Sequence, residues 1–97
     1  MPTYIMLWKY TNQGVANIKD GPRRLDAGKQ SARALGGEIT GYYLTKGQYD
    51  GISVFEMPDD EAMAKLALSV GALGNITTET LRAFPEDEFR ALIADLP

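Results

Sequence analysis

A tyrosine followed directly by an aspartate, Tyr49-Asp50, comes at the end of a sequence that is typical of a hairpin turn. Gly47 supplies the positive φ that a short loop needs, and aromatic or β-branched residues flank it. A phenol beside a carboxylate can hold or relay a proton, so the pair is a candidate for proton transfer or for substrate binding. The alternative is structural: Asp50 accepts backbone N–H groups and Tyr49 packs. The residue types alone leave both interpretations open.

The chain contains neither histidine nor cysteine. Ordinary zinc sites, Ser-His-Asp and Cys-His triads, and haem ligation by these residues are therefore excluded. The consecutive acids Asp59-Asp60-Glu61 do not predict a metal site, because side chains at the start of a helix diverge around its axis. Any acid–base chemistry must come from Asp, Glu, Tyr or Lys, and we expect neither a metal nor a cofactor.

Three positively charged side chains, Lys19, Arg23 and Arg24, gather around Pro22 at the predicted start of a helix. The helix dipole and the free N–H groups of a first turn favour anions, so an anionic ligand group could dock there. A charged helix face exposed to water is the commoner outcome. All three residues are candidates for ligand binding.

Arg82 lies inside a predicted strand, between Leu81 and Ala83. A guanidinium in a sheet usually has a carboxylate or phosphate partner. Glu56 or Asp50 would supply that partner within the chain, and a bound ligand would supply it otherwise. The internal pair is the favoured interpretation, and Arg82 remains a candidate ligand-binding residue.

Length and composition predict one globular domain, residues 1–97, with a modest core. No apolar run approaches the ~20 residues that would span a bilayer. The N-terminus lacks the basic segment of a signal peptide, so we expect a soluble cytoplasmic protein that does not bind membranes. The net charge of −3 argues against a nucleic-acid partner, which normally requires a concentrated basic face.

Hydrophobic periodicity and turn residues predict an α+β domain with the order β-α-β-β-α-β and a short C-terminal helix. The expected strands are 3–10, 38–45, 50–57 and 75–84, and a short helical turn is expected over 14–19. The main helices follow Pro22 and Pro58, and Gly28 in the buried stripe of the first predicts a close approach to the sheet. In the C-terminal helix, Phe89, Leu92 and Ile93 are expected to face inward. This order predicts a ferredoxin-like antiparallel sheet with both main helices on one face.

Both faces of the predicted sheet carry apolar residues, whereas a sheet with one solvated face should alternate apolar and polar residues. The first strand places apolar or aromatic residues on each face, Tyr4, Met6, Trp8 and Tyr10 against Ile5 and Leu7. In the second strand we expect Ile39 and Tyr43 opposite Tyr42 and Leu44. A second copy of the chain would cover the open face, so we predict a homodimer or a higher homo-oligomer. Trp8, Tyr42 and Tyr43 could also line a pocket for an apolar or aromatic ligand, although a place in the core or in the dimer interface is commoner.

Several blocks of residues together resemble one family of small proteins. They are Gln13-Gly14, Ile18-Lys19-Asp20, Pro22 and Arg24; Tyr43-Leu44-Thr45 with Gly47, Tyr49 and Asp50; Pro58-Asp59-Asp60-Glu61; and Gly71 through Phe84. The pattern covers almost the whole chain and is similar to the GYD domain family, ferredoxin-like proteins related to the dimeric α+β barrels. One departure is Gln48, which separates Gly47 from Tyr49. The resemblance implies the fold and oligomerisation, and it implies no particular activity.

Two functions stay open. The first is a homodimeric module that binds a small organic ligand, which the missing metal ligands and missing nucleophile favour. The second is a cofactor-independent enzyme, resembling what related barrels do, such as a monooxygenase or isomerase acting on an activated aromatic or polyketide-like substrate. Tyr49 and Asp50 are its candidate catalytic residues. An RNA-recognition module is disfavoured, because residues 50–57 offer Ser53, Val54 and Phe55 with an acidic balance in place of the basic-Gly-aromatic-x-aromatic series that stacks on bases.

Overall fold

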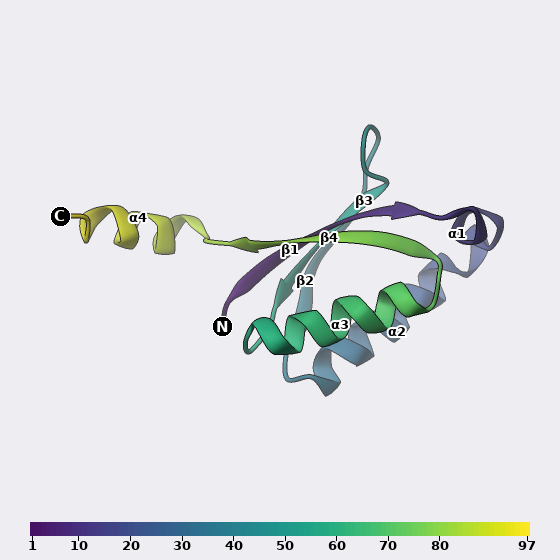
Figure 1. Cartoon of the computed structure of the whole chain (residues 1–97), viewed down its shortest axis with the longest axis horizontal. Helices are drawn as coiled ribbons and strands as arrows, with labels where there is room; N and C mark the ends of the chain where they lie inside the picture. Colours follow the sequence, from purple (N-terminus) through teal and green to yellow (C-terminus); the bar gives the residue numbers. More distant parts are fainter.

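The computed structural model describes all 97 residues and contains a four-stranded antiparallel sheet with two long helices on one face (Figure 1). The strands lie in the order β2-β3-β1-β4, with bounds β1 (Thr3–Tyr10), β2 (Glu38–Leu44), β3 (Gly51–Glu56) and β4 (Ile76–Ala83). The helices are α1 (Asn12–Ala16), the 3₁₀ turn η1 (Ile18–Asp20), α2 (Gly21–Ala34), α3 (Asp60–Ala72) and α4 (Glu86–Ala94). This arrangement confirms the predicted ferredoxin-like topology, and no helix is long and apolar enough to cross a membrane.

Local signals determine where the two long helices begin. A proline occupies the first turn of α2, where its missing N–H leaves no hydrogen bond unmade. Asp59 caps α3, because its Oδ1 accepts a hydrogen bond from the Ala62 N–H at 2.8 Å. The buried faces of both helices pack on β1 and β3 to form the core, which contains Tyr4, Met6, Trp8, Ala32, Phe55, Met57, Met63 and Leu66.

A β-bulge in β2 changes which of its residues face the helices. Ile39 pairs with Phe55 and Tyr42 pairs with Ser53, and the register shifts between Ile39 and Gly41. Ile39 and Tyr42 therefore share the helix-facing side, and Tyr43 lies on the open side. The predicted alternation, which placed Ile39 with Tyr43, was wrong because one extra residue in a strand inverts the facing of every residue after it.

The connection between β2 and β3 is longer than the tight hairpin that was predicted. Residues 45–50 form a loop, closed by a hydrogen bond from the Thr45 N–H to the Asp50 carbonyl at 2.9 Å. Gly47 has the expected positive φ, at 125°. Tyr49 and Asp50 consequently lie in the loop, before the first residue of β3.

The open face of the sheet is apolar at its centre. Ile5 of β1 lies between Val54 and Leu81 of the neighbouring strands, and Leu7 lies beside Ile52. Both long helices lie on the other face (Figure 1). The prediction that apolar residues occupy both faces is therefore confirmed for β1.

Helix α4 extends away from the sheet instead of packing on it (Figure 1). Phe89, Leu92 and Ile93, which were predicted to face inward, are 54%, 50% and 52% exposed. The prediction was wrong for the single chain, because Pro85 starts α4 beyond the end of β4 and leaves no core surface within its reach. We call the exposed apolar side chains here the α4 surface; they are Phe84, Phe89, Leu92, Ile93 and Leu96.

Candidate functional site

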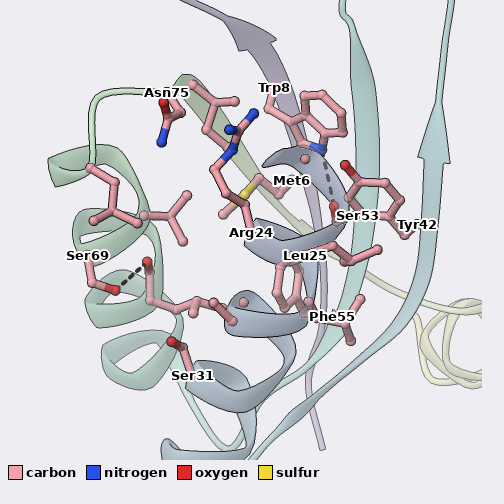
Figure 2. A pocket seen from close by; sticks show the side chains of 18 of the residues that line it. Met6, Trp8, Arg24, Leu25, Ser31, Tyr42, Ser53, Phe55, Ser69 and Asn75 are labelled. Atoms are coloured by element: carbon pink, nitrogen blue, oxygen red, sulfur yellow. Dashed lines mark hydrogen bonds between the residues drawn. The ribbon is translucent and has the colours of Figure 1, made fainter. Parts of the chain in front are cut away.

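A cavity of about 340 Å³ lies between the sheet and helices α2 and α3 (Figure 2). Its floor includes Met6, Trp8 and Phe55, and its walls include Leu25 of α2 and Val70 of α3. Most of its lining is apolar, with a few hydroxyl and amide groups and one charge. A mainly apolar hollow of this volume with a few convergent polar groups is typical of small-molecule sites.

Gly28 of α2 leaves room for the cavity. A Cβ placed on Gly28 would meet only the Ile39 Cδ1, at 3.9 Å, which is an ordinary van der Waals distance. The prediction that Gly28 allows the helix to approach the sheet closely was therefore wrong. The small residue instead widens the space between helix and sheet.

Trp8 is the only tryptophan of the chain, and its position is fixed by three neighbours. Its Nε1 donates a buried hydrogen bond to Ser53 Oγ at 3.1 Å. Its ring stacks on Tyr42, with the centroids 5.5 Å apart, and meets Tyr10 edge to face at 5.2 Å. Gly51 is required beneath it, because any Cβ at that position would overlap the indole. The aromatic end of the cavity is therefore preorganised.

Arg24 brings the only formal charge to the cavity lining. Its Nη1 donates to the Asn17 carbonyl at 2.8 Å, whereas its Nη2 is buried and has no hydrogen-bond partner. Burial raises the pKa of Tyr42 above its usual value, and the neighbouring Tyr10 adds to this effect. The charge of Arg24 acts on the pKa of Tyr42 in the opposite direction. The Arg24 guanidinium is thus the one charged group that favours the ionised form of Tyr42 at this end of the cavity.

The two cations predicted alongside Arg24 lie outside the cavity. Arg23 is 87% exposed at its side chain and makes a 3.9 Å ion pair with Asp20. Lys19 is exposed as well. Arg24 is therefore the only one of the three candidate anion-binding residues that lines the cavity.

Tyr49 and Asp50 have separate partners. The Tyr49 hydroxyl donates to Glu79 Oε2 at 3.0 Å, and this bond raises the pKa of Tyr49. Lys9 Nζ lies 5.4 Å from the centroid of the Tyr49 ring. Asp50 Oδ2 instead accepts the backbone N–H of Tyr10 at 2.8 Å. Neither side chain lines the cavity, and the hydrogen bonds of Asp50 match the structural interpretation.

Replacing Asp50 by alanine is expected to destabilise the fold by about 1–3 kcal/mol, because the Tyr10 N–H loses its acceptor in a half-buried place. Asp50→Asn keeps an acceptor oxygen for the Tyr10 N–H and should lower the free energy of unfolding by less. Urea denaturation of the two variants measures the difference. Equal stability of wild type and Asp50→Ala would contradict the structural role.

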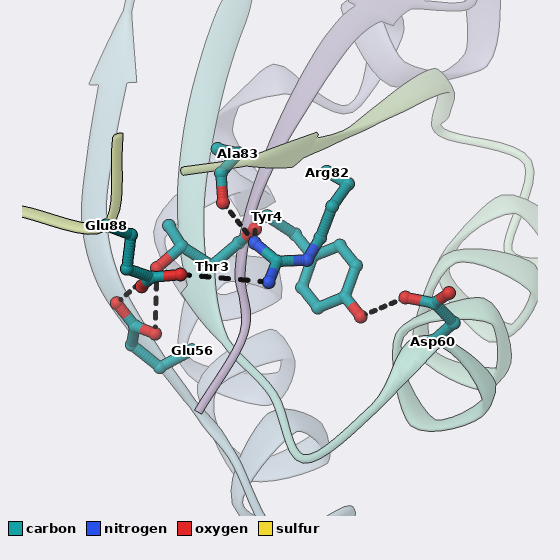
Figure 3. A network of polar contacts seen from close by, with 7 residues as sticks. All are labelled: Thr3, Tyr4, Glu56, Asp60, Arg82, Ala83 and Glu88. Carbon is teal, nitrogen blue, oxygen red and sulfur yellow. Dashed lines mark hydrogen bonds and ion pairs between the residues drawn. The ribbon is translucent and has the colours of Figure 1, made fainter. Parts of the chain in front are cut away.

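Arg82 and Tyr43 lie elsewhere on the sheet. The Arg82 guanidinium donates from Nη1 to the Thr3 carbonyl at 3.3 Å and to the Ala83 carbonyl, and Nη2 lies 3.9 Å from Glu88 (Figure 3). Its carboxylate partner is thus Glu88 of α4, not Glu56 or Asp50. Tyr43 is 59% exposed on the open face. Neither residue lines the cavity.

Tyr4, a core residue of β1 close to Arg82, is held in place by a hydrogen bond to α3. The Tyr4 hydroxyl donates to Asp60 Oδ1 (Figure 3). Burial, the bond to Asp60 and its negative charge raise the pKa of Tyr4 to about 12. The Tyr4 phenol therefore stays protonated at any physiological pH. Its hydrogen bond to Asp60 links β1 to α3 and has a structural role.

Several lining residues were not singled out from the sequence. Ser53 is 4% exposed and is the polar member of the buried series Gly51, Ser53, Phe55. A single hydroxyl among apolar residues on one face of a strand could have identified Ser53 as a candidate polar group of a binding site. Arg24 was a candidate together with Lys19 and Arg23, and its spacing of four residues from Gly28, which puts both on one helix face, was the signal that distinguishes it from Arg23. Asn75 follows α3 and lines the cavity without any signal in its neighbours.

Comparisons with known proteins give a relative, a similar fold and a family. A protein of Thermus thermophilus named "Glutamine synthetase and cystathionine beta-lyase binding protein" is 30% identical over 86 residues, which are 88% of this chain and 90% of that protein. A crystal structure of a Thermus thermophilus protein is similar in fold, with a TM-score of 0.56 and 22% identity, covering 87% of this chain and 94% of the other. The GYD domain family model matches residues 4–93. The chain therefore belongs to the GYD domain family.

Proposed function

We propose that this chain is a homodimeric binding module that holds a small, largely apolar organic molecule between the sheet and helices α2 and α3. The cavity of about 340 Å³ carries the proposal, since it lies between two helices and a sheet and has an aromatic end. Its volume falls within the roughly 300–1,000 Å³ of typical ligand sites.

Fluorescence of Trp8 provides the test, because the only tryptophan of the chain lines the cavity. A titration with neutral aryl amides, phenylbutyramide and naphthamide, should change the Trp8 emission saturably, with one molecule bound per chain. Isothermal titration calorimetry supplies an independent stoichiometry. If neither amide binds, the cavity is not a site for small apolar molecules and the proposal fails.

The homodimer is proposed from the open sheet face. Ile5, Leu7, Ile52 and Val54 are only partly covered in the single chain, and they lie together on neighbouring strands. A contact between two such faces is self-complementary under a two-fold axis, so one surface serves both copies. The cavity opens on the other side of the sheet and stays accessible in this dimer.

A second candidate function is the binding of a partner protein that is an enzyme. The Thermus relative is named for binding glutamine synthetase and cystathionine beta-lyase. The α4 surface favours a protein partner, because five large apolar side chains on one short terminal segment are at least half exposed. Contiguous exposed apolar residues are typical of protein–protein contacts. A complex through α4 is compatible with a ligand in the cavity.

The cofactor-independent enzyme is less well supported by the geometry. Tyr49 and Asp50 lie outside the cavity and have separate partners. Inside it, the raised pKa of Tyr42 keeps that phenol protonated at neutral pH, so it is a poor general base. No carboxylate lines the cavity. Proton abstraction would need a group that the site does not contain.

A further inference from the structure

Building on the proposed function, we infer that the ligand of this cavity is a monoanion, a carboxylic acid with an apolar body, whose carboxylate pairs with Arg24. The unpartnered guanidinium nitrogen at the polar end of an apolar cavity points to this class of molecule. The proposal adds a charge requirement to a site that is otherwise defined by shape and apolarity.

The first support is the state of Arg24. Its Nη1 is held by the Asn17 carbonyl at 2.8 Å, and this bond orients the guanidinium plane. Its Nη2 is buried and has no partner in the chain. A buried donor without an acceptor is costly, and the cost is larger for a charged group. A carboxylate at this point would remove the cost by accepting the hydrogen bond that Nη2 does not make within the chain.

The second support is the absence of any competing acid. The cavity lining contains no Asp or Glu, and Arg24 makes none of the ion pairs of the chain. Figure 2 shows the guanidinium reaching the polar end of the cavity, in the region of Asn75 and Trp8. No carboxylate of the chain therefore neutralises the positive charge of Arg24.

The remaining lining determines the rest of the ligand. Away from Arg24 the walls are apolar, with Leu25, Phe55 and Val70 among them, so the body of the ligand must be apolar too. Arg23 and Lys19 face solvent, so no second cation is present to neutralise a dianion. A phosphate monoester thus fits less well than a carboxylic acid.

A matched pair of probes tests the charge requirement. Phenylbutyrate and phenylbutyramide have the same shape and differ in charge. We expect wild type to bind the acid at least about tenfold more tightly than the amide, as followed by Trp8 fluorescence and calorimetry. Arg24→Gln should weaken binding of the acid about tenfold to a hundredfold and change binding of the amide by less than about twofold. Arg24→Lys should recover part of the preference.

Arg23→Gln is the matched control, because it removes the same charge one residue away at a solvent-exposed position. It should leave both affinities unchanged. Equal binding of acid and amide by wild type would overturn the inference without any variant, so the test does not depend on the folding of Arg24→Gln. Tighter binding of phenylbutyl phosphate than of phenylbutyrate would overturn the inference that the ligand is a monoanion. Failure of both neutral amides to bind would remove the proposed function itself, whereas binding of the amides without a preference for the acid would remove only the charge requirement.

Discussion

A Gly28→Leu protein is expected to fold at least as well as wild type and to lose binding of small apolar molecules. The Cβ has room, since only Ile39 Cδ1 lies near it, at 3.9 Å. Replacing a helical glycine by leucine should add about 1 kcal/mol to the free energy of unfolding, because leucine is the better helix former. The leucine side chain then occupies the cavity, so affinity for the aryl amides should fall on the order of a hundredfold or more.

Gly71→Leu is the control for this prediction. Gly71 lies on the exposed side of α3, does not line the cavity, and has no atom within 4 Å of a built Cβ. This variant should be as stable as wild type or more so, and should bind the amides normally. Thermal unfolding and titration of both variants provide the comparison. Normal binding by a folded Gly28→Leu protein would show that the ligand site lies elsewhere.

Replacing Ile5 by lysine is expected to convert dimers into folded monomers. Ile5 occupies the middle of the open sheet face, with Val54 and Leu81 as its neighbours across the strands. In the proposed dimer each copy would bury a lysine ammonium without a partner, at a cost of several kcal/mol per ion. The dissociation constant should therefore rise at least on the order of a thousandfold.

Sedimentation equilibrium over a range of protein concentrations measures this change. Ala64→Lys adds the same charge on the exposed side of α3 and should leave the dimer intact. Far-ultraviolet circular dichroism checks that the Ile5→Lys chain stays folded. A dimer that survives Ile5→Lys would place the interface on another surface, with the α4 surface as the first candidate.

The topology was predictable because its signals are local. Pro22 and Asp59 begin the two long helices, and Gly47 turns the chain between β2 and β3. These residues act through φ, caps and missing N–H groups, which depend on immediate neighbours. The order of strands and helices then leaves few possible arrangements, so the ferredoxin-like sheet could be inferred correctly.

The site was less predictable because it depends on distances between elements. A glycine at position 28 is compatible with close packing of α2 on the sheet and with a cavity between them, and only the three-dimensional structure distinguishes the two. The bulge in β2 moved Tyr42 to the helix-facing side, and its signal in the sequence was the isolated Gly41 inside the strand. Helix α4 has the periodicity of a packed helix, yet its apolar side chains are at least half exposed in the single chain. Arg24 and Arg23 differ by about 100° around the helix axis, which separates a cavity residue from a surface residue.

Native mass spectrometry of the gently purified protein, beside its denatured mass, tests the central claim most directly. We predict a dimer that carries additional non-covalent mass, up to one small molecule per chain, and a Gly28→Leu protein that is a dimer without that mass. Accurate mass and fragmentation of the released molecule should then identify an apolar carboxylic acid. A monomer of bare polypeptide mass would contradict both the dimer and the bound ligand.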